Sequence, residues 1–361
     1  MNALREAAWP PLDPERRRAL ATLLRGVAGA AVLGGLHGCG GGGGGNDTPS
    51  PAPAPSPAPT PTPAPPPSGP IAAQTSVPLP VGYDADRLAA FTRLNEIRLS
   101  AGLGMLAQSP TLDQAAQAHA AWIIANDSFT HVETAGTPGF TGAHWWDRAE
   151  AAGYVPIEGD EVIAGPARGA AGVDALVNSV YHRAALLSFE PVDVGIGWSA
   201  GSATEISMPL VIEVTRPGGD PARGAGQTAQ ASIDGVSTWP TDGAANVPLR
   251  LGDETPNPVP THDVATLGLP VSLIVDEETT ISVDAFVVSK ATGGEVLQGQ
   301  ILTSANDPHS LLPRAFVAFV PLTPLAADTA YRVDFTGAAT GFLTGVRRSI
   351  RRSWSFTTAS A

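Results

Sequence analysis

Two histidines and one glutamate, far apart along the chain, are the residue types best suited to chemistry. His131 stands in FTHVE directly after an alanine-rich segment, Glu161 stands in the apolar run DEVIAG, and His182 stands in YHRAALL. Two imidazoles and one carboxylate form the ligand set of many zinc sites that keep an open position. The three residues are therefore a candidate cleft site for zinc or another divalent metal.

Alternatives exist for each of these residues. Glu161 could be a structural glutamate paired with Arg148 or Arg183, because a lone carboxylate in an apolar run is costly without a partner. Glu133, two positions after His131, is the candidate general base for a metal-bound water. We expect no serine or cysteine beside a base, and this favours binding over covalent catalysis.

The remaining histidines fit structural positions better. His119 shares an apolar helix face with alanines and an isoleucine, which predicts a core residue. His144 precedes two tryptophans, and this cluster could rim a cleft, although simple helix packing explains it better. His262 and His309 are expected to be solvated loop residues of the second half of the chain.

Two helices are expected to support His131. Apolar residues recur at helical spacing from Leu88 to Ile97, and Gly102 ends this segment. Ser109 followed by proline predicts an N-cap for a second helix that ends near Asn126. His131 then lies in the loop that follows this helix.

Two further helices and two strands complete a first folded domain over residues 81–217. The helices are predicted over 142–153 and 172–188, and the strands over 193–200 and 206–217. Helices interleaved with a few strands indicate a layered α+β domain.

The second folded domain is predicted over residues 237–361, after a linker over 218–236. Alternating apolar residues and turn motifs indicate strands. PLAADTAYRVDF places Tyr331 just inside a strand, as in the tyrosine corner of immunoglobulin-like sandwiches. Together with the WPTDGAANVPLRL opening and the RRSWSFTT ending, the region resembles bacterial Ig-like modules, which implies an all-β sandwich.

The N-terminal 80 residues read as an export and tethering segment. Residues 1–38 combine an arginine cluster with a short apolar run, which predicts a lipoprotein-type signal peptide of the twin-arginine or the ordinary Sec type. LHGC ends at Cys39, the single cysteine of the chain, and resembles a lipobox, so Cys39 is the predicted lipidation site. Residues 39–80 are a Gly/Pro-rich segment that predicts a disordered linker.

Charge and cysteine content exclude several classes of protein. The formal net charge is −13, with 21 basic and 34 acidic residues, so nucleic acid is not expected as a partner. One cysteine excludes a disulfide-rich secreted scaffold.

The ordered motifs from FTRLNEIRLSAGLGML to VGIGW resemble the CAP superfamily of cysteine-rich secretory, antigen 5 and pathogenesis-related proteins, in a disulfide-free bacterial SCP-like form. The resemblance implies an α-β-α sandwich whose cleft carries two histidines and two glutamates and often binds a divalent metal. His131, Glu161 and His182 match three of these positions. Where the second glutamate is expected the chain has Asn178 and Ser179, so Ser179 is an auxiliary candidate and the set is reduced to three.

The function predicted from these features is that of an exported, lipid-anchored CAP-domain protein. Its cleft would bind a divalent metal and a small or apolar ligand or an envelope-protein partner. The alternatives are a metal-dependent hydrolase or peptidase that uses the same cleft, and a purely structural envelope or adhesion protein. The expected location is the outer membrane or cell surface through the lipid anchor, or the periplasm or medium without it.

Overall fold

The computed structural model describes residues 71–361 except 202–207, 218–229, 232–234, 253, 277–278 and 343. The predicted signal peptide, Cys39 and nearly all of the Gly/Pro-rich linker therefore lie outside the described residues. A short parallel pair joins β1 (Ile71–Ala72) to β6 (Gln230–Ala231). In the described part of the chain, no helix has both the length and the apolar character needed to cross a bilayer.

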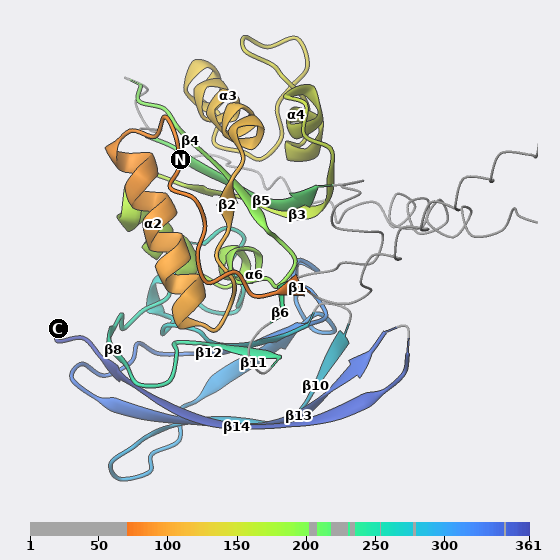
Figure 1. The fold of residues 1–361 in the computed structure, drawn as a ribbon. Coiled ribbons are helices and arrows are strands. Elements are labelled where there is room, and N and C mark those ends of the chain that lie inside the picture. The colour runs from red at the N-terminus through yellow and green to blue at the C-terminus, as the bar shows by residue number, and fades with distance from the viewer. Residues whose placement is uncertain are drawn as a thin grey trace, which may run out of the picture.

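The first domain is a sheet with helices on both faces (Figure 1). The sheet order is β2-β4-β5-β3, with β3 antiparallel to β5. One face packs against α2, α5 and α6, and the other packs against α3 and α4. The bounds of these elements are α2 Ala85–Ser100, β2 Ala107–Gln108, α3 Pro110–Asn126, α4 Trp145–Ala151, β3 Pro156–Ala164, α5 Gly169–Val177, α6 Tyr181–Leu186, β4 Asp193–Trp198 and β5 Leu210–Pro217.

Strand alternation decides which residues face each helical layer. In β3, Val162 faces the core under α2 and α5, whereas Ile163 packs against α3. In β5, Ile212 faces the core under α2 and α5, and Val211 packs against α3. Glu161 is two residues before Ile163, so its side chain lies on the α3 face of the sheet.

Helix α3 lies close to the sheet because β4 carries glycines beneath it. A Cβ atom on Gly195 would collide with Leu112, and one on Gly197 would collide with the backbone of Ala116 and Gln117. The predicted limits of this helix are confirmed: Ser109 caps it through Leu112 N, and the helix ends at Asn126. The chain then leaves toward His131.

The predicted helix over residues 172–188 is wrong in one respect, because it is two helices. Helix α5 ends at Val177 and α6 begins at Tyr181. The N–H groups of Val180 and Tyr181 do not continue the first helix but bond to Glu254, which lies in the C-terminal half of the chain. A tertiary contact therefore overrides the helical periodicity of the sequence.

The C-terminal half is a strand-rich domain with two sheets in its described part. Their orders are β10-β13-β14-β8 and β11-β12-β9-β7, and a shared apolar core lies between them. Tyr331 is fully buried, and its hydroxyl accepts from Ala326 N at 2.8 Å, as the tyrosine-corner motif predicts. The strands are β7 Val236–Trp239, β8 Ala244–Val247, β9 Val271–Val275, β10 Thr279–Lys290, β11 Gly299–Thr303, β12 Phe316–Pro321, β13 Ala330–Gly341 and β14 Arg347–Thr358, with a 3-10 turn, η1, at Val264–Thr266.

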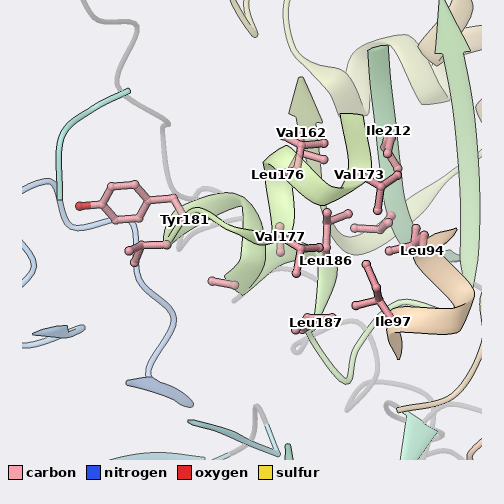
Figure 2. Packing of buried hydrophobic residues seen from close by; sticks show 14 of the residues in the cluster. Leu94, Ile97, Val162, Val173, Leu176, Val177, Tyr181, Leu186, Leu187 and Ile212 are labelled. Carbon is pink, nitrogen blue, oxygen red and sulfur yellow. The ribbon is translucent and has the colours of Figure 1, made fainter. Parts of the chain in front are cut away.

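Strand β12 is buried on both faces. Val317 and Phe319 point into the core of the β-domain, whereas Phe316 and Ala318 join the apolar cluster of the first domain. Figure 2 shows this cluster and shows Tyr181 projecting from α6 away from its other members. The Tyr181 hydroxyl donates to Asp307 Oδ1 at 2.6 Å. The two domains thus share one continuous apolar interface.

The expectation for His309 is wrong for the same reason. His309 is half-buried, its Nε2 lies 2.9 Å from the carbonyl oxygen of Asn257, and its ring meets the Tyr181 ring edge-on. His262 is exposed, as expected.

We predict that Phe316→Ala destabilises both domains together. The lost side chain leaves a cavity in the shared cluster, so the free energy of unfolding should fall by about 3–5 kcal/mol. Amide hydrogen exchange should show loss of protection in both β5 and β13. The control Val296→Ala removes a side chain that is 55% exposed, and it should change stability by less than about 0.5 kcal/mol. Loss of protection confined to the β-domain would contradict a shared interface.

Candidate functional site

Glu161 and Arg148 form a buried ion pair at the centre of the candidate site. Arg148 Nη2 lies 2.5 Å from Glu161 Oε2, and both side chains are fully buried. Burial by itself would raise the pKa of Glu161, but Arg148, His119 and the hydrogen bond from His131 outweigh it and hold that pKa well below its ordinary value. Glu161 is therefore ionised, and of the two predicted partners Arg148 is the observed one.

Arg148 also fixes the loop that carries His131. Its Nη1 donates to the carbonyl oxygens of His131, Gly142 and Ala143 at 3.2–3.4 Å. The loop starts at Asp127, which caps α3 in the left-handed region with φ 47°. The Arg148 guanidinium thus bonds to the loop near its start, at His131, and near its end, at Gly142 and Ala143, as well as to the Glu161 carboxylate.

His131 is oriented by Glu161. Its Nδ1 lies 3.0 Å from Glu161 Oε1, and its side chain is 26% exposed. Burial lowers the pKa of His131 and, together with the charges of His182 and His119, outweighs the hydrogen bond and the charge of Glu161, which raise it. The ring is therefore neutral at pH 7, with its proton on Nδ1 facing the carboxylate and the lone pair on Nε2.

Glu133 belongs to the same network but lies on its inner side. The side chain is fully buried, and its Oε1 lies 3.0 Å from His119 Nδ1. Its Oε2 accepts from the backbone N–H of Thr141 at 2.7 Å. Burial would raise the pKa of Glu133, but the bonds from His119 and Thr141 and the Arg148 charge lower it. A carboxylate so enclosed is poorly placed to accept a proton from a water molecule beside His131.

The interpretation of His119 as a core residue agrees with its surroundings. The ring is fully buried, and its two nitrogens face the carboxylate of Glu133 and the carbonyl oxygen of Thr130. Neither nitrogen is left for a metal. His144 stacks on Trp146 at 4.5 Å between ring centroids and faces Asp147, as helix packing predicts.

His182 is held by Ser179 and Glu254. Its Nδ1 lies 2.9 Å from Ser179 Oγ and 3.4 Å from Glu254 Oε1. The Ser179 hydroxyl donates to the carbonyl oxygen of Leu176, so toward His182 it can only accept. In the neutral ring the proton therefore sits on Nδ1 and the lone pair on Nε2.

The two histidines lie on segments that flank the edge strand β3. The loop of His131 lies on the α3 side of the sheet, and α6 contacts β3 from the other side. The charge of His182 is close enough to lower the pKa of His131 further. Each histidine uses Nδ1 for a polar contact within the protein.

In the predicted ligand set of two histidines and Glu161, the carboxylate already has partners within the protein. Both oxygens of Glu161 are engaged, one by Arg148 and one by His131. Across the described residues, no group of three His, Cys, Asp or Glu side chains is arranged to hold a metal ion. The rest of the predicted set is two imidazoles, whereas catalytic zinc sites use three protein ligands.

The expectation that no serine lies beside a base is wrong for Ser179. Ser179 does contact His182, but it is fully buried and its proton is used by Leu176. The segment GWSAG over residues 197–201 has the GxSxG spacing. Ser199 follows the end of β4, and the next element among the described residues, β5, is a strand, whereas a nucleophile elbow leads into a helix.

Two polar residues of the site, Glu254 and Glu213, were not predicted from the sequence. Glu254 reaches the site from 72 residues beyond His182, and no local pattern indicates this contact. Glu213 lies opposite Glu161 in the β3–β5 register and is fully buried. Among the described residues, neither of its oxygens has a hydrogen-bond partner. Its place within the apolar run LVIEV is a signal that could have found it.

Glu213 differs from Glu161 in protonation. Burial raises the pKa of Glu213 well above its ordinary value, and the charge of Glu161 adds to this, while Arg148 only partly opposes it. The two opposed carboxyls therefore divide into one ionised and one neutral group, as expected for like groups that share a buried site.

Comparisons with known proteins place a CAP domain in this part of the chain. Residues 91–206 match the family model described as "CAP: Cysteine-rich secretory protein family". The resemblance noted in the sequence is thus confirmed for these residues, whereas the immunoglobulin-like resemblance of the C-terminal half stays a prediction. No curated protein matches the chain.

Two solved structures are similar to part of the chain. One is an outer surface protein from Borrelia burgdorferi, with 21% identity, a TM-score of 0.31, and coverage of 36% of this chain and 92% of that chain. The other is an extracellular protein containing a SCP domain from Bacillus anthracis str. Ames, with 21% identity and a TM-score of 0.30. In that case the match covers 36% of this chain and 41% of the other.

We predict that Glu161→Gln strongly destabilises the protein. The change leaves the buried Arg148 without its anionic partner, so the free energy of unfolding should fall by about 3–5 kcal/mol. Urea unfolding at pH 7 measures this. The control Glu158→Gln lies on the same strand, and its 31% exposed side chain pairs with Arg216. It should cost at most about 1 kcal/mol, and equal effects of the two changes would contradict the central role of Glu161.

We predict that Glu213→Gln stabilises the protein increasingly as the pH rises. A carboxyl whose pKa is raised on folding binds its proton more tightly in the folded state. Its stabilising contribution is complete below the unfolded pKa, near 4.5, and is lost as the pH rises toward the folded value. The difference between variant and wild type should therefore grow between pH 5 and pH 8, by at most about 1.4 kcal/mol per pH unit.

Urea unfolding at several pH values tests the Glu213 prediction. The informative quantity is the slope with pH of the difference in unfolding free energy between variant and wild type. A pH-independent cost of the new amide would shift this difference equally at every pH. The control Glu96→Gln changes a 61% exposed side chain, and its difference from wild type should stay flat. A flat difference for Glu213→Gln as well would show that Glu213 is ionised in the folded protein.

Proposed function

We propose that the CAP domain is a binding module of an exported, lipid-anchored protein and that His131 and His182 are its ligand-binding residues. The observation that carries this proposal is the shared orientation of the two rings. Each Nδ1 faces oxygens within the protein, and each Nε2 thereby carries the lone pair. Imidazoles held in this way are typical of metal-binding histidines and of histidines that accept hydrogen bonds from a ligand.

A divalent cation is the simplest species that two such nitrogens could bind. With two imidazole donors it would be held weakly and reversibly and would keep positions for water or a second ligand. Glu161 at His131, and Ser179 with Glu254 at His182, then act by orienting the rings rather than by binding the ion. Because His131 is neutral at pH 7, its ring does not repel a cation.

Apolar surface in the same loop supports a small organic ligand beside the cation. Phe129 and Phe140 are 37% and 38% exposed, and both lie in the loop that Arg148 fixes. Exposed aromatic side chains near a few oriented polar groups are typical of ligand sites.

A hydrolase is less well supported by the geometry. Glu133, the candidate general base, is enclosed by His119 and Thr141. Glu161 is engaged by Arg148. Water activation at this site would therefore lack a base among the described carboxylates next to His131. A purely structural role for the protein would require that His131 and His182 can be replaced without loss of function.

The tether is proposed from the sequence alone. Cys39 as a lipidated residue and residues 1–38 as an export signal would place the domain at the outer membrane or cell surface. Without lipidation the protein would be periplasmic or secreted. The proposed partners are the membrane through the anchor and an envelope protein or a small lipid-like molecule at the cleft.

We predict that the double variant His131→Ala/His182→Ala weakens zinc binding at least tenfold. Removal of both nitrogens takes away the donors, and tenfold corresponds to about 1.4 kcal/mol. Isothermal titration of the purified full chain with Zn²⁺ at pH 7 measures the affinity. The control His144→Ala changes a 34% exposed histidine in the same domain and should leave the affinity unchanged. Equal zinc affinity in wild type and double variant would refute the proposed site.

A further inference from the structure

A carboxylate from the C-terminal domain holds the start of the helix that carries His182. Glu254 Oε2 accepts from Val180 N and its Oε1 from Tyr181 N, each at 2.6 Å. The same Oε1 lies 3.4 Å from His182 Nδ1. Glu254 is 5% exposed, so these contacts are made away from bulk water, where charge-assisted hydrogen bonds are strong.

The approach of this segment to α6 is built into the backbone. Gly252 N donates to the carbonyl oxygen of Asn178 at 3.2 Å. A Cβ atom on Gly252 would lie 3.1 Å from the carbonyl oxygen of Ala175, so a side chain there would push the segment away. The glycine therefore lets Glu254 reach the break between α5 and α6.

Three consecutive residues of α6 contact three different segments of the C-terminal domain. Tyr181 donates to Asp307, His182 faces Glu254, and Arg183 Nη1 donates to the carbonyl oxygen of Pro270 at 2.7 Å. The Arg183 side chain is fully buried. The helix is thus fixed against rotation and translation by a domain other than its own.

We propose that Glu254 is the positioning residue of His182, so that the C-terminal domain completes the ligand site of the CAP domain. The carboxylate fixes the helix start through two backbone N–H groups. Its Oε1, 3.4 Å from His182 Nδ1, acts together with the nearer Ser179 Oγ, at 2.9 Å, to keep the His182 proton on Nδ1, which leaves Nε2 for the ligand. Without it, Ser179 is the one described acceptor left on this nitrogen, and the start of α6 is unsupported. The ligand-affinity part of this proposal rests on the function proposed above, whereas the ring orientation does not.

The variant Glu254→Gln separates positioning from simple capping. A glutamine can accept from one backbone N–H with its carbonyl oxygen, but its amide group presents N–H to the other donors. A capping role alone would change stability without changing the His182 ring. Positioning requires that the ring itself responds.

Nitrogen-15 NMR of histidine side chains in the full-length chain reports the tautomer directly. We expect wild-type His182 to be almost wholly Nδ1–H and Glu254→Gln to show a mixture of both tautomers. We expect its Zn²⁺ affinity to fall about tenfold. The matched control Asp307→Asn loosens the same interface at Tyr181 but leaves the His182 tautomer and the Zn²⁺ affinity as in wild type.

The outcomes distinguish the two proposals. An unchanged His182 tautomer in a folded Glu254→Gln protein overturns the positioning role. Absence of Zn²⁺ binding in wild type, together with the expected tautomer change, overturns the proposed function and supports the positioning role.

A second variant covers the case in which Glu254→Gln does not fold. Ser179→Ala leaves Glu254 as the remaining acceptor on His182 Nδ1 and should keep the Nδ1–H tautomer. Loss of that tautomer in Ser179→Ala would assign the orientation to Ser179 and overturn the proposal.

Discussion

The ion pair between Arg148 and Glu161 is the interaction on which the first domain depends. Both groups are fully buried and meet at 2.5 Å, and a buried charge without its partner is among the most costly defects in a protein. The pair joins α4 to β3, orients His131 and closes the loop after α3 through backbone carbonyls. The neutral Glu213 beside it lets a second carboxyl occupy the same face of the sheet without adding another negative charge.

The second histidine depends on a different part of the chain. His131 is held by elements of its own domain, whereas His182 stands on a six-residue helix whose first N–H groups bond to Glu254. Helices this short have little stability by themselves, so their position is set by tertiary contacts. The proposed site therefore combines a histidine held within the CAP domain with one whose helix start is held by the β-domain.

Local signals in the sequence predicted much of this structure, and distant contacts explain the rest. Ser109 and the apolar spacing gave the limits of α3, and the environment of Tyr331 matches its motif. The break between α5 and α6 could not be predicted, because it arises from Glu254, 74 residues beyond Val180. The apolar run around Glu161 predicted that it needs a partner, but choosing Arg148 over Arg183 required the fold.

The strand from Phe316 to Pro321 is buried along its whole length, and this limits how the two halves of the protein can be separated. A β-sandwich cut away from its neighbour would expose alternate apolar residues of a strand that is rich in phenylalanine and valine and free of charge. Segments of this kind favour self-association and aggregation. The C-terminal half is consequently expected to be poorly soluble when it is expressed alone. Exchanging the halves between relatives would require polar residues on the exposed face of this strand.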